Sequence, residues 1–146
     1  MSRPTPNPRT AGALSGYTVV DLSRALAGPH AGQLFGDLGA RVIKVENPAS
    51  GDDSRSWGPP FVGPADDPQA TYFFSCNRNK ESIALDLKSE DGKATLRALI
   101  ARADVLVENF RGGVLDRLDA AIDVHGGQRR ARPYLRSQRR RLARAR

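Results

Sequence analysis

The apolar residues of this chain fall into short β-branched runs that alternate with segments of helical spacing. Residues 17–21 hold the first run, and residues 41–46 hold a second one, Arg-Val-Ile-Lys-Val-Glu. Between them Ala27-Gly28-Pro29 interrupts the pattern, and residues 30–38 predict a helix of about two and a half turns. Two apolar runs joined by a crossover of this length predict a parallel, right-handed βαβ unit.

A second strand–helix–strand unit follows further along the chain. Residues 82–87 alternate apolar and polar side chains, as a half-buried strand does. Ser89 suits the N-cap of the next helix, in which apolar residues recur at i, i+3 and i+4 from Leu96. Residues 104–110 complete the unit as a third clear strand.

The remaining segments of the chain carry weaker patterns. Residues 70–76 are apolar and short, and they fit either a helix or a strand. Residues 47–68 hold five prolines and three glycines, so we expect no regular element there. Residues 114–118 begin a further helix after a Gly-Gly pair. The order β-α-β, long loop, β-α-β, α predicts an α/β fold with a mainly parallel sheet.

Charge is distributed unevenly and separates a tail from the body. The 146 residues hold 23 Lys and Arg against 16 Asp and Glu, a net charge of +7. Nine of the arginines lie in residues 128–146, which hold no acid, so the other 127 residues carry 14 bases against 16 acids. Apolar periodicity stops near residue 118. We therefore predict a flexible leader (1–13), a folded body (14–118) and a disordered basic tail (119–146).

Composition excludes several classes of protein. The sequence contains no stretch of about 18 apolar residues, so we predict no membrane span. The proline-containing N-terminus differs from a secretory signal. Cys76 is the only cysteine, which rules out an intrachain disulfide and a multi-cysteine metal site and fits a reducing cytoplasm. We expect Cys76 to be buried. The two histidines, His30 and His125, lack the spacing that would support a catalytic triad, and we assign no metal site.

The candidate ligand sites lie where the predicted strands end, which is where α/β folds bind ligands. Residues 23–30 connect the first strand to a helix, and they offer an anion free N–H groups and the charge of Arg24. This loop contains neither G-x-G-x-x-G nor a Walker A sequence, and an ordinary strand-to-helix turn fits it equally. Residues 108–111, Glu-Asn-Phe-Arg, suit an anionic or amide-bearing ligand, with a solvated loop as the alternative.

Short motifs run in a fixed order through residues 14–118. They are Leu-Ser-Gly-Tyr-Thr-Val-Val-Asp-Leu-Ser, Ala-Gly-Pro, Leu-Phe-Gly-Asp-Leu-Gly-Ala-Arg-Val-Ile-Lys-Val-Glu, Gly-Asp-Asp-Ser-Arg, the 73–80 segment with Ser-Ile-Ala-Leu-Asp-Leu-Lys, Ala-Asp-Val-Leu-Val-Glu-Asn-Phe-Arg and Gly-Val-Leu-Asp-Arg-Leu. Each motif alone has low specificity for a family, but the ordered set is specific. It resembles CoA-transferase family III, the group of formyl-CoA transferase, carnitine CoA-transferase and alpha-methylacyl-CoA racemase.

This resemblance implies the N-terminal part of a Rossmann-like large domain that binds coenzyme A. It implies an enzyme that transfers CoA from an acyl-CoA to a carboxylic acid through an aspartyl-CoA thioester. CoA or acyl-CoA is then a substrate and no cofactor is bound permanently, while full-length relatives form interlocked homodimers without a membrane partner. Carried over by position, the CoA contacts fall on Arg24, Ala27, Asn47, Leu85, Asn109, Arg117 and Leu118.

Three departures from the family pattern bear on activity. Leu26 stands where some transferases carry a glutamine that assists the active site, which disfavours a formyl-CoA-specific enzyme. The resemblance places the nucleophilic aspartate beyond residue 146, so we assign no catalytic residue and expect this chain to be inactive alone. Residues 119–146 match no family motif, and we interpret them as translated out of frame.

Two other functions stay open on the sequence. An acyl-CoA racemase of the same family fits the same motifs. A non-specific nucleic-acid binder would act through the arginine-rich tail, since clustered arginines attract phosphate backbones in a salt-dependent way. The tail carries one aromatic residue, Tyr134, and no recognition fold, so we expect no specific nucleic-acid partner.

Overall fold

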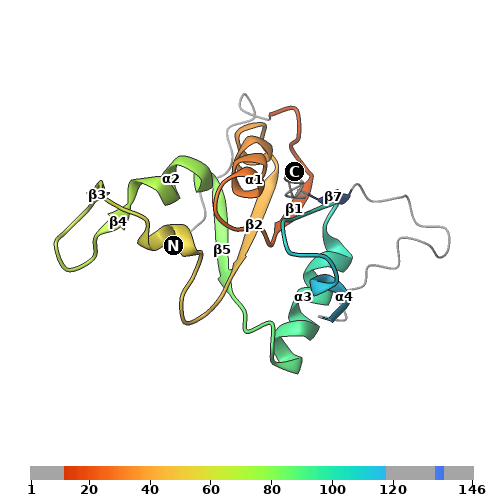
Figure 1. Ribbon diagram of the computed structural model, residues 1–146. Coiled ribbons are helices and arrows are strands. Elements are labelled where there is room, and N and C mark those ends of the chain that lie inside the picture. Colours follow the sequence, from red (N-terminus) through yellow and green to blue (C-terminus); the bar gives the residue numbers. More distant parts are fainter. Residues whose placement is uncertain (1–11, 118–133, 137–146) are drawn as a thin grey trace, which may run out of the picture.

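The computed structural model describes residues 12–117 and 134–136, which form an α/β fold (Figure 1). Five parallel strands make the main sheet, in the order β5-β2-β1-β6-β7. β1 lies between β2 and β6, so the chain extends the sheet in both directions from its first strand. The predicted α/β class with a parallel sheet is confirmed. The strands are β1 Thr18–Asp21, β2 Arg41–Glu46, β5 Lys80–Ala84, β6 Val105–Glu108 and β7 Tyr134–Arg136.

Helices cover both faces of this sheet. Val19 and Val42 belong to a core cluster that packs with Phe35 of α1 (Ala27–Asp37). Val20, one position along β1, belongs to a second cluster with Leu96 of α3 (Glu90–Arg102). Successive side chains of a strand point to opposite faces, so α1 and α3 lie on opposite sides of the sheet. Strands that are buried on both faces explain the continuous apolar runs in the sequence.

Two glycines let α1 lie very close to the end of β1. A Cβ atom at Gly32 would lie 2.7 Å from Asp21 Oδ2, and one at Gly28 would lie 2.3 Å from the Cβ of Ser23. Side chains at these two positions would therefore collide with buried polar groups. The missing Cβ atoms bring the start of α1 against the residues that follow β1.

The predicted boundaries shift most clearly in α1 and β5, and β6 (Val105–Glu108) is shorter than the predicted strand 104–110. α1 begins at Ala27, three residues before the predicted start, because Pro29 in a first helical turn loses no intrahelical hydrogen bond. β5 covers residues 80–84 rather than 82–87. The chain turns at Asp86, whose carboxylate accepts the N–H of Lys88 at 2.9 Å, and such an Asx turn ends the strand. The helix predicted after Ser89 is confirmed, and the Ser89 hydroxyl accepts the Gly92 N–H.

The proline-rich segment is more regular than predicted. It contains the 3₁₀ helix η2 (Asp53–Ser56) and the short strand β3 (Phe61–Val62), which pairs with β4 (Gln69–Ala70). Asp52 stabilises η2 by accepting the N–H of Ser54. The ambiguous segment that follows forms the helix α2 (Thr71–Asn77), and the β3–β4 pair projects beyond it (Figure 1).

Both chain ends lie largely outside the described residues. This holds for most of the predicted leader (1–13) and for the predicted disordered tail (119–146), except residues 134–136. Those three residues form β7, which pairs with β6 where no strand was predicted. Cys76 is buried, as expected, with 2% of its surface exposed. Among the described helices, the last of which is α4 (Val114–Arg117), none has the length and apolar character needed to cross a membrane.

Candidate functional site

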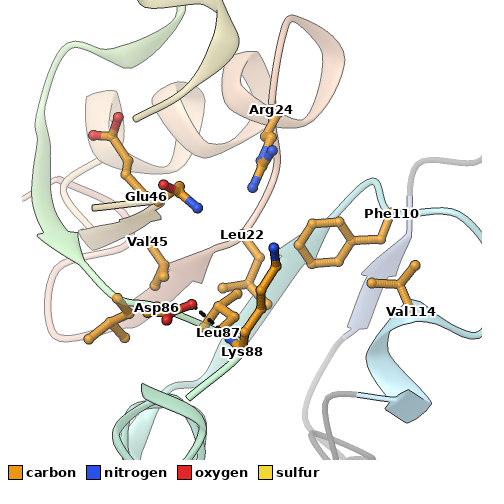
Figure 2. Close-up of a pocket in the computed structure, with 11 residues that line it drawn as sticks. Leu22, Arg24, Val45, Glu46, Asp86, Leu87, Lys88, Phe110 and Val114 are labelled. Carbon is orange, nitrogen blue, oxygen red and sulfur yellow. Dashed lines mark hydrogen bonds between the residues drawn. The ribbon is translucent and has the colours of Figure 1, made fainter. Parts of the chain in front are cut away.

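A pocket of about 230 Å³ opens at the carboxyl ends of four parallel strands (Figure 2). It lies beside the point where the sheet extends in two directions from β1, the usual ligand position of an open α/β sheet. The residues that follow β1, β2, β5 and β6 supply most of the lining. The lining residues are Leu22, Arg24, Val45, Glu46, Asn47, Leu85, Asp86, Leu87, Lys88, Phe110 and Val114.

The pocket combines apolar walls with two cations. Leu22 and Val45 are buried, and Phe110 is half-buried beside them. The side chains of Arg24 and Lys88 point into the same space from opposite sides (Figure 2). Within the described part of the chain, neither charged group pairs with a carboxylate. Two like charges that face one space favour an anion between them.

Glu46 also lines the pocket, but its carboxylate is already occupied. Arg55 donates to both carboxylate oxygens, at 2.7 and 2.8 Å, and Ser82 donates at 2.6 Å. Burial opposes ionisation of Glu46, but these bonds and the Asp52 N–H outweigh it and lower the pKa of Glu46 to about 2. The Arg55 guanidinium stacks on Phe73, 3.8 Å from the ring centre. The Arg55 charge therefore offsets the negative charge that Glu46 brings to the pocket.

The backbone of Arg24 is fixed by Asn109. The Arg24 N–H donates to Asn109 Oδ1 at 3.0 Å, and Asn109 Nδ2 donates to the Arg24 carbonyl at 2.7 Å. This paired bond joins the loop after β1 to the end of β6. Asn109 therefore holds Arg24 in place and does not itself line the pocket.

The structure brings part of the predicted contact set together. Arg24, Asn47 and Leu85 line the pocket, and Asn109 contacts the Arg24 backbone. Ala27 is exposed at the first turn of α1 and does not line it. Two further predicted contacts are not placed: Arg117 ends α4 with its side chain undescribed, and Leu118 lies outside the described residues.

The second predicted cluster, residues 108–111, divides by role. Glu108 is buried and accepts the N–H of Phe110 at 2.6 Å, so it shapes the turn after β6. Phe110 lines the pocket, whereas Arg111 is exposed. Leu26, at the N-cap of α1, is half-exposed and forms no side-chain cap.

Sequence reasoning missed Lys88, the second cation of the pocket. The alternation of Leu85 and Leu87 predicted a strand and hid the turn that begins at Asp86. An Asp two residues before Lys88 and a Ser one residue after it are turn and cap signals, and they could have indicated this geometry. His30 is exposed on α1, away from the pocket lining. Residues 12–117 and 134–136 contain no group of three or more His, Cys, Asp or Glu side chains that could hold a metal ion.

Comparisons with known proteins point to one family. The sequence profile described as CoA-transferase family III matches residues 14–124. Succinate–glutarate CoA-transferase of Agrobacterium fabrum is 55% identical over 100 residues, which are 67% of this chain and 25% of that protein. Acetyl-CoA:oxalate CoA-transferase of Acetobacter aceti is 47% identical over 118 residues, 81% of this chain and 29% of that protein.

A solved structure shares the fold as well as the sequence. The crystal structure of a CAIB/BAIF family protein from Brucella suis is 50% identical, with a TM-score of 0.71. The match covers 75% of this chain and 29% of that one. The chain thus spans about a quarter of the length of the relatives that it matches.

Proposed function

Because the chain belongs to CoA-transferase family III, we propose that it binds the coenzyme A part of an acyl-CoA in the pocket of Figure 2. The observation that carries this proposal is the convergence of Arg24 and Lys88 on one space with apolar walls. Coenzyme A offers phosphate groups that suit two cations, and an adenine ring that suits apolar side chains. Asn47 and Leu85 border the same space.

The residues that line or support the pocket take different roles in this proposal. Arg24 and Lys88 bind phosphate oxygens, while Leu22 and Phe110 contact the base. Asn109 acts on the ligand through the backbone of Arg24, to which it is bonded twice. Contacts of Ala27, Arg117 and Leu118 with CoA stay predictions.

For the whole protein we propose transfer of CoA from an acyl-CoA to a short dicarboxylic acid through an aspartyl-CoA thioester. The names of the relatives support this choice over a racemase, since these relatives are CoA-transferases named for succinate, glutarate and oxalate. The interlocked homodimer and the cytoplasmic location belong to the same proposal and rest on the family resemblance and on the single cysteine.

Asp86 lines the pocket, but its carboxylate accepts the Lys88 N–H at 2.9 Å and shapes the Asx turn, which makes it a poor candidate for the nucleophile. The two aspartates that contact the loop carrying Arg24 are poor candidates as well. Asp21 and Asp52 are buried and paired with Lys80 and Lys44, at 2.8 and 2.7 Å. We therefore propose that the 146-residue chain binds CoA without transferring it. Turnover of succinyl-CoA and glutarate by the purified chain would refute this part of the proposal.

Calorimetric titration of the chain with CoA tests the binding site. We expect Arg24→Met and Lys88→Met each to weaken binding about tenfold, as expected for one lost charge-assisted bond to phosphate. Arg102→Met, which changes an exposed cation at the end of α3, is the control and should bind normally. The proposed site would be contradicted if the wild-type chain did not bind CoA, or if the wild type and the three variants bound it equally well.

The same titration with 3′-dephospho-CoA assigns the phosphates. A ligand without the 3′-phosphate should bind the wild-type chain more weakly. One of the two variants, Arg24→Met or Lys88→Met, lacks the cation that contacts the 3′-phosphate. That variant should bind CoA and 3′-dephospho-CoA equally well, because the interaction with the 3′-phosphate is already lost.

A further inference from the structure

Buried ion pairs lie under the loop that carries Arg24. Lys44 of β2 donates to the carbonyl of Ser23 at 2.9 Å and pairs with Asp52 Oδ2 at 2.7 Å. The side chains of Lys44 and Asp52 are 2% and 0% exposed. Asp52 Oδ1 also accepts the N–H of Ala25 at 3.4 Å. One buried pair therefore reaches the backbone of the loop at two points.

A second buried pair holds the first turn of α1, which follows the same loop. Lys80 of β5 donates to the carbonyl of Pro29 at 2.8 Å, to Asp21 Oδ2 at 2.8 Å and to Asn77 Oδ1 at 2.8 Å. These three acceptors match the three hydrogens of an ammonium group. Asp21 Oδ1 in turn accepts from the N–H and the hydroxyl of Ser23. The loop is thus tied to the sheet at its start and, through the first turn of α1, just beyond its end.

Between these ties the backbone adopts a conformation that it would not choose alone. Ala25 has a φ of 72°, in the left-handed region that disfavours any residue with a Cβ. It follows Arg24, whose N–H and carbonyl are both bonded to Asn109. Surrounding contacts must hold such a residue in place, and sites of this kind often serve function.

We propose that Lys44, Asp52 and Lys80 are positioning residues, which fix residues 22–29, the loop after β1 and the first turn of α1, in their ligand-ready form before CoA arrives. The proposal rests on the proposed CoA pocket, because Arg24 is the residue that this loop presents to it. Buried ion pairs contribute little net stability compared with apolar packing. What they supply here is a donor for the Ser23 carbonyl in the loop and a further donor for the Pro29 carbonyl in the first turn of α1.

Hydrogen exchange of the free 146-residue chain tests whether the loop is fixed in advance. We expect the amides of Arg24 and Ala25 to exchange slowly, at rates near those of β1, without ligand. Exchange as fast as that of Asp66, in an exposed loop, would overturn the proposal. This measurement needs no ligand, so it decides the question even if the chain fails to bind CoA.

Paired substitutions test the link to affinity. Lys44→Met with Asp52→Asn removes both charges of the buried pair while keeping the side-chain volumes. We expect about tenfold weaker CoA binding, which corresponds to a loop that is ligand-ready about one tenth of the time. Arg41→Gln with Glu81→Gln removes an exposed pair from β2 and β5, 2.8 Å apart, and should leave affinity unchanged. Unchanged affinity in the Lys44 and Asp52 variant would overturn the proposal.

A third substitution separates positioning from general stability. Ala25→Gly removes the Cβ that disfavours the left-handed conformation, and it keeps the backbone N–H that donates to Asp52 Oδ1 in the wild type. Added to the Lys44→Met, Asp52→Asn background, it should recover about fivefold in CoA affinity. A role limited to overall stability predicts no recovery, and that result would contradict positioning. If the paired variant does not fold, the exchange rates of the wild-type loop decide the question.

Discussion

Gly32 lies where α1 crosses the buried pair of Asp21 and Lys80. A Cβ at this position would approach Asp21 Oδ2 to 2.7 Å and Lys80 Nζ to 3.2 Å. In an exposed helix, Gly→Ala gains about 1 kcal/mol. Here we expect Gly32→Ala to lower the free energy of unfolding by about 1–3 kcal/mol, because two buried charged groups cannot move aside freely. Urea titration measures the change, and a stabilised variant would contradict the close packing.

Glu46 makes a residue-scale prediction about pH. Its pKa falls from 4.5 to about 2 on folding, chiefly because the Arg55 and Ser82 bonds outweigh burial. A carboxyl whose pKa is lowered in the folded state stabilises the fold above the unfolded-state value and loses that contribution as pH falls. We expect a loss of up to about 3 kcal/mol between pH 4.5 and 2. Glu46→Gln lacks this titration, so its unfolding free energy should approach that of the wild type over this range. A difference in unfolding free energy between the wild type and Glu46→Gln that stays constant with pH would contradict this prediction.

At the scale of single elements, α3 depends on its first turn. Ser89 accepts the N–H of Gly92 at 3.1 Å, and Glu90 and Asp91 follow it. Ser89→Ala should cost about 1 kcal/mol of unfolding free energy, measured by thermal or urea unfolding. Thr95→Ala, at an exposed position within the same helix, is the control and should be neutral or slightly stabilising. Equal effects of the two substitutions would show that the cap contributes nothing.

Elements were predictable where local pattern and packing agree. β2 matched its prediction, residue for residue, because its apolar run has no competing turn signal. β5 did not, because the alternation continues through Leu87 although the chain turns at Asp86. Periodicity reports which side chains could face a core, and it does not report where an edge strand stops pairing.

The site was predictable only in part, for a related reason. Arg24, Asn47 and Leu85 follow strand ends and line the pocket, while their contact with CoA stays a prediction. Lys44 lies inside an apolar strand, and its partner Asp52 comes from the proline-rich segment. That pairing depends on how η2 folds back onto the sheet. Local sequence contains no signal for such a contact, so the buried network became visible only in the structure.

At the scale of the whole molecule, the pocket exists only when the parallel sheet is assembled. Arg24 follows β1 and Lys88 follows β5, and these strands lie on opposite sides of β2. The pocket cations, the Lys44 pair and the Lys80 pair therefore all depend on one strand order. Unfolding of β5, an exposed strand at the sheet edge, would remove Lys80 from the loop and Lys88 from the pocket together.

The distribution of charge over the whole chain predicts a separable second interaction. Nine arginines in residues 128–146 stand against a net charge of −2 in the other 127 residues. We expect weak, non-specific binding of duplex DNA that weakens steeply as salt rises, because arginines release counterions from the phosphate backbone. Changing the eight tail arginines outside β7 to Gln should abolish DNA binding and leave β7 intact, and a fluorescence anisotropy titration at several salt concentrations measures this. CoA affinity should stay unchanged, since the pocket lining ends at Val114. DNA binding that survives the substitutions would instead place the basic surface on the folded body.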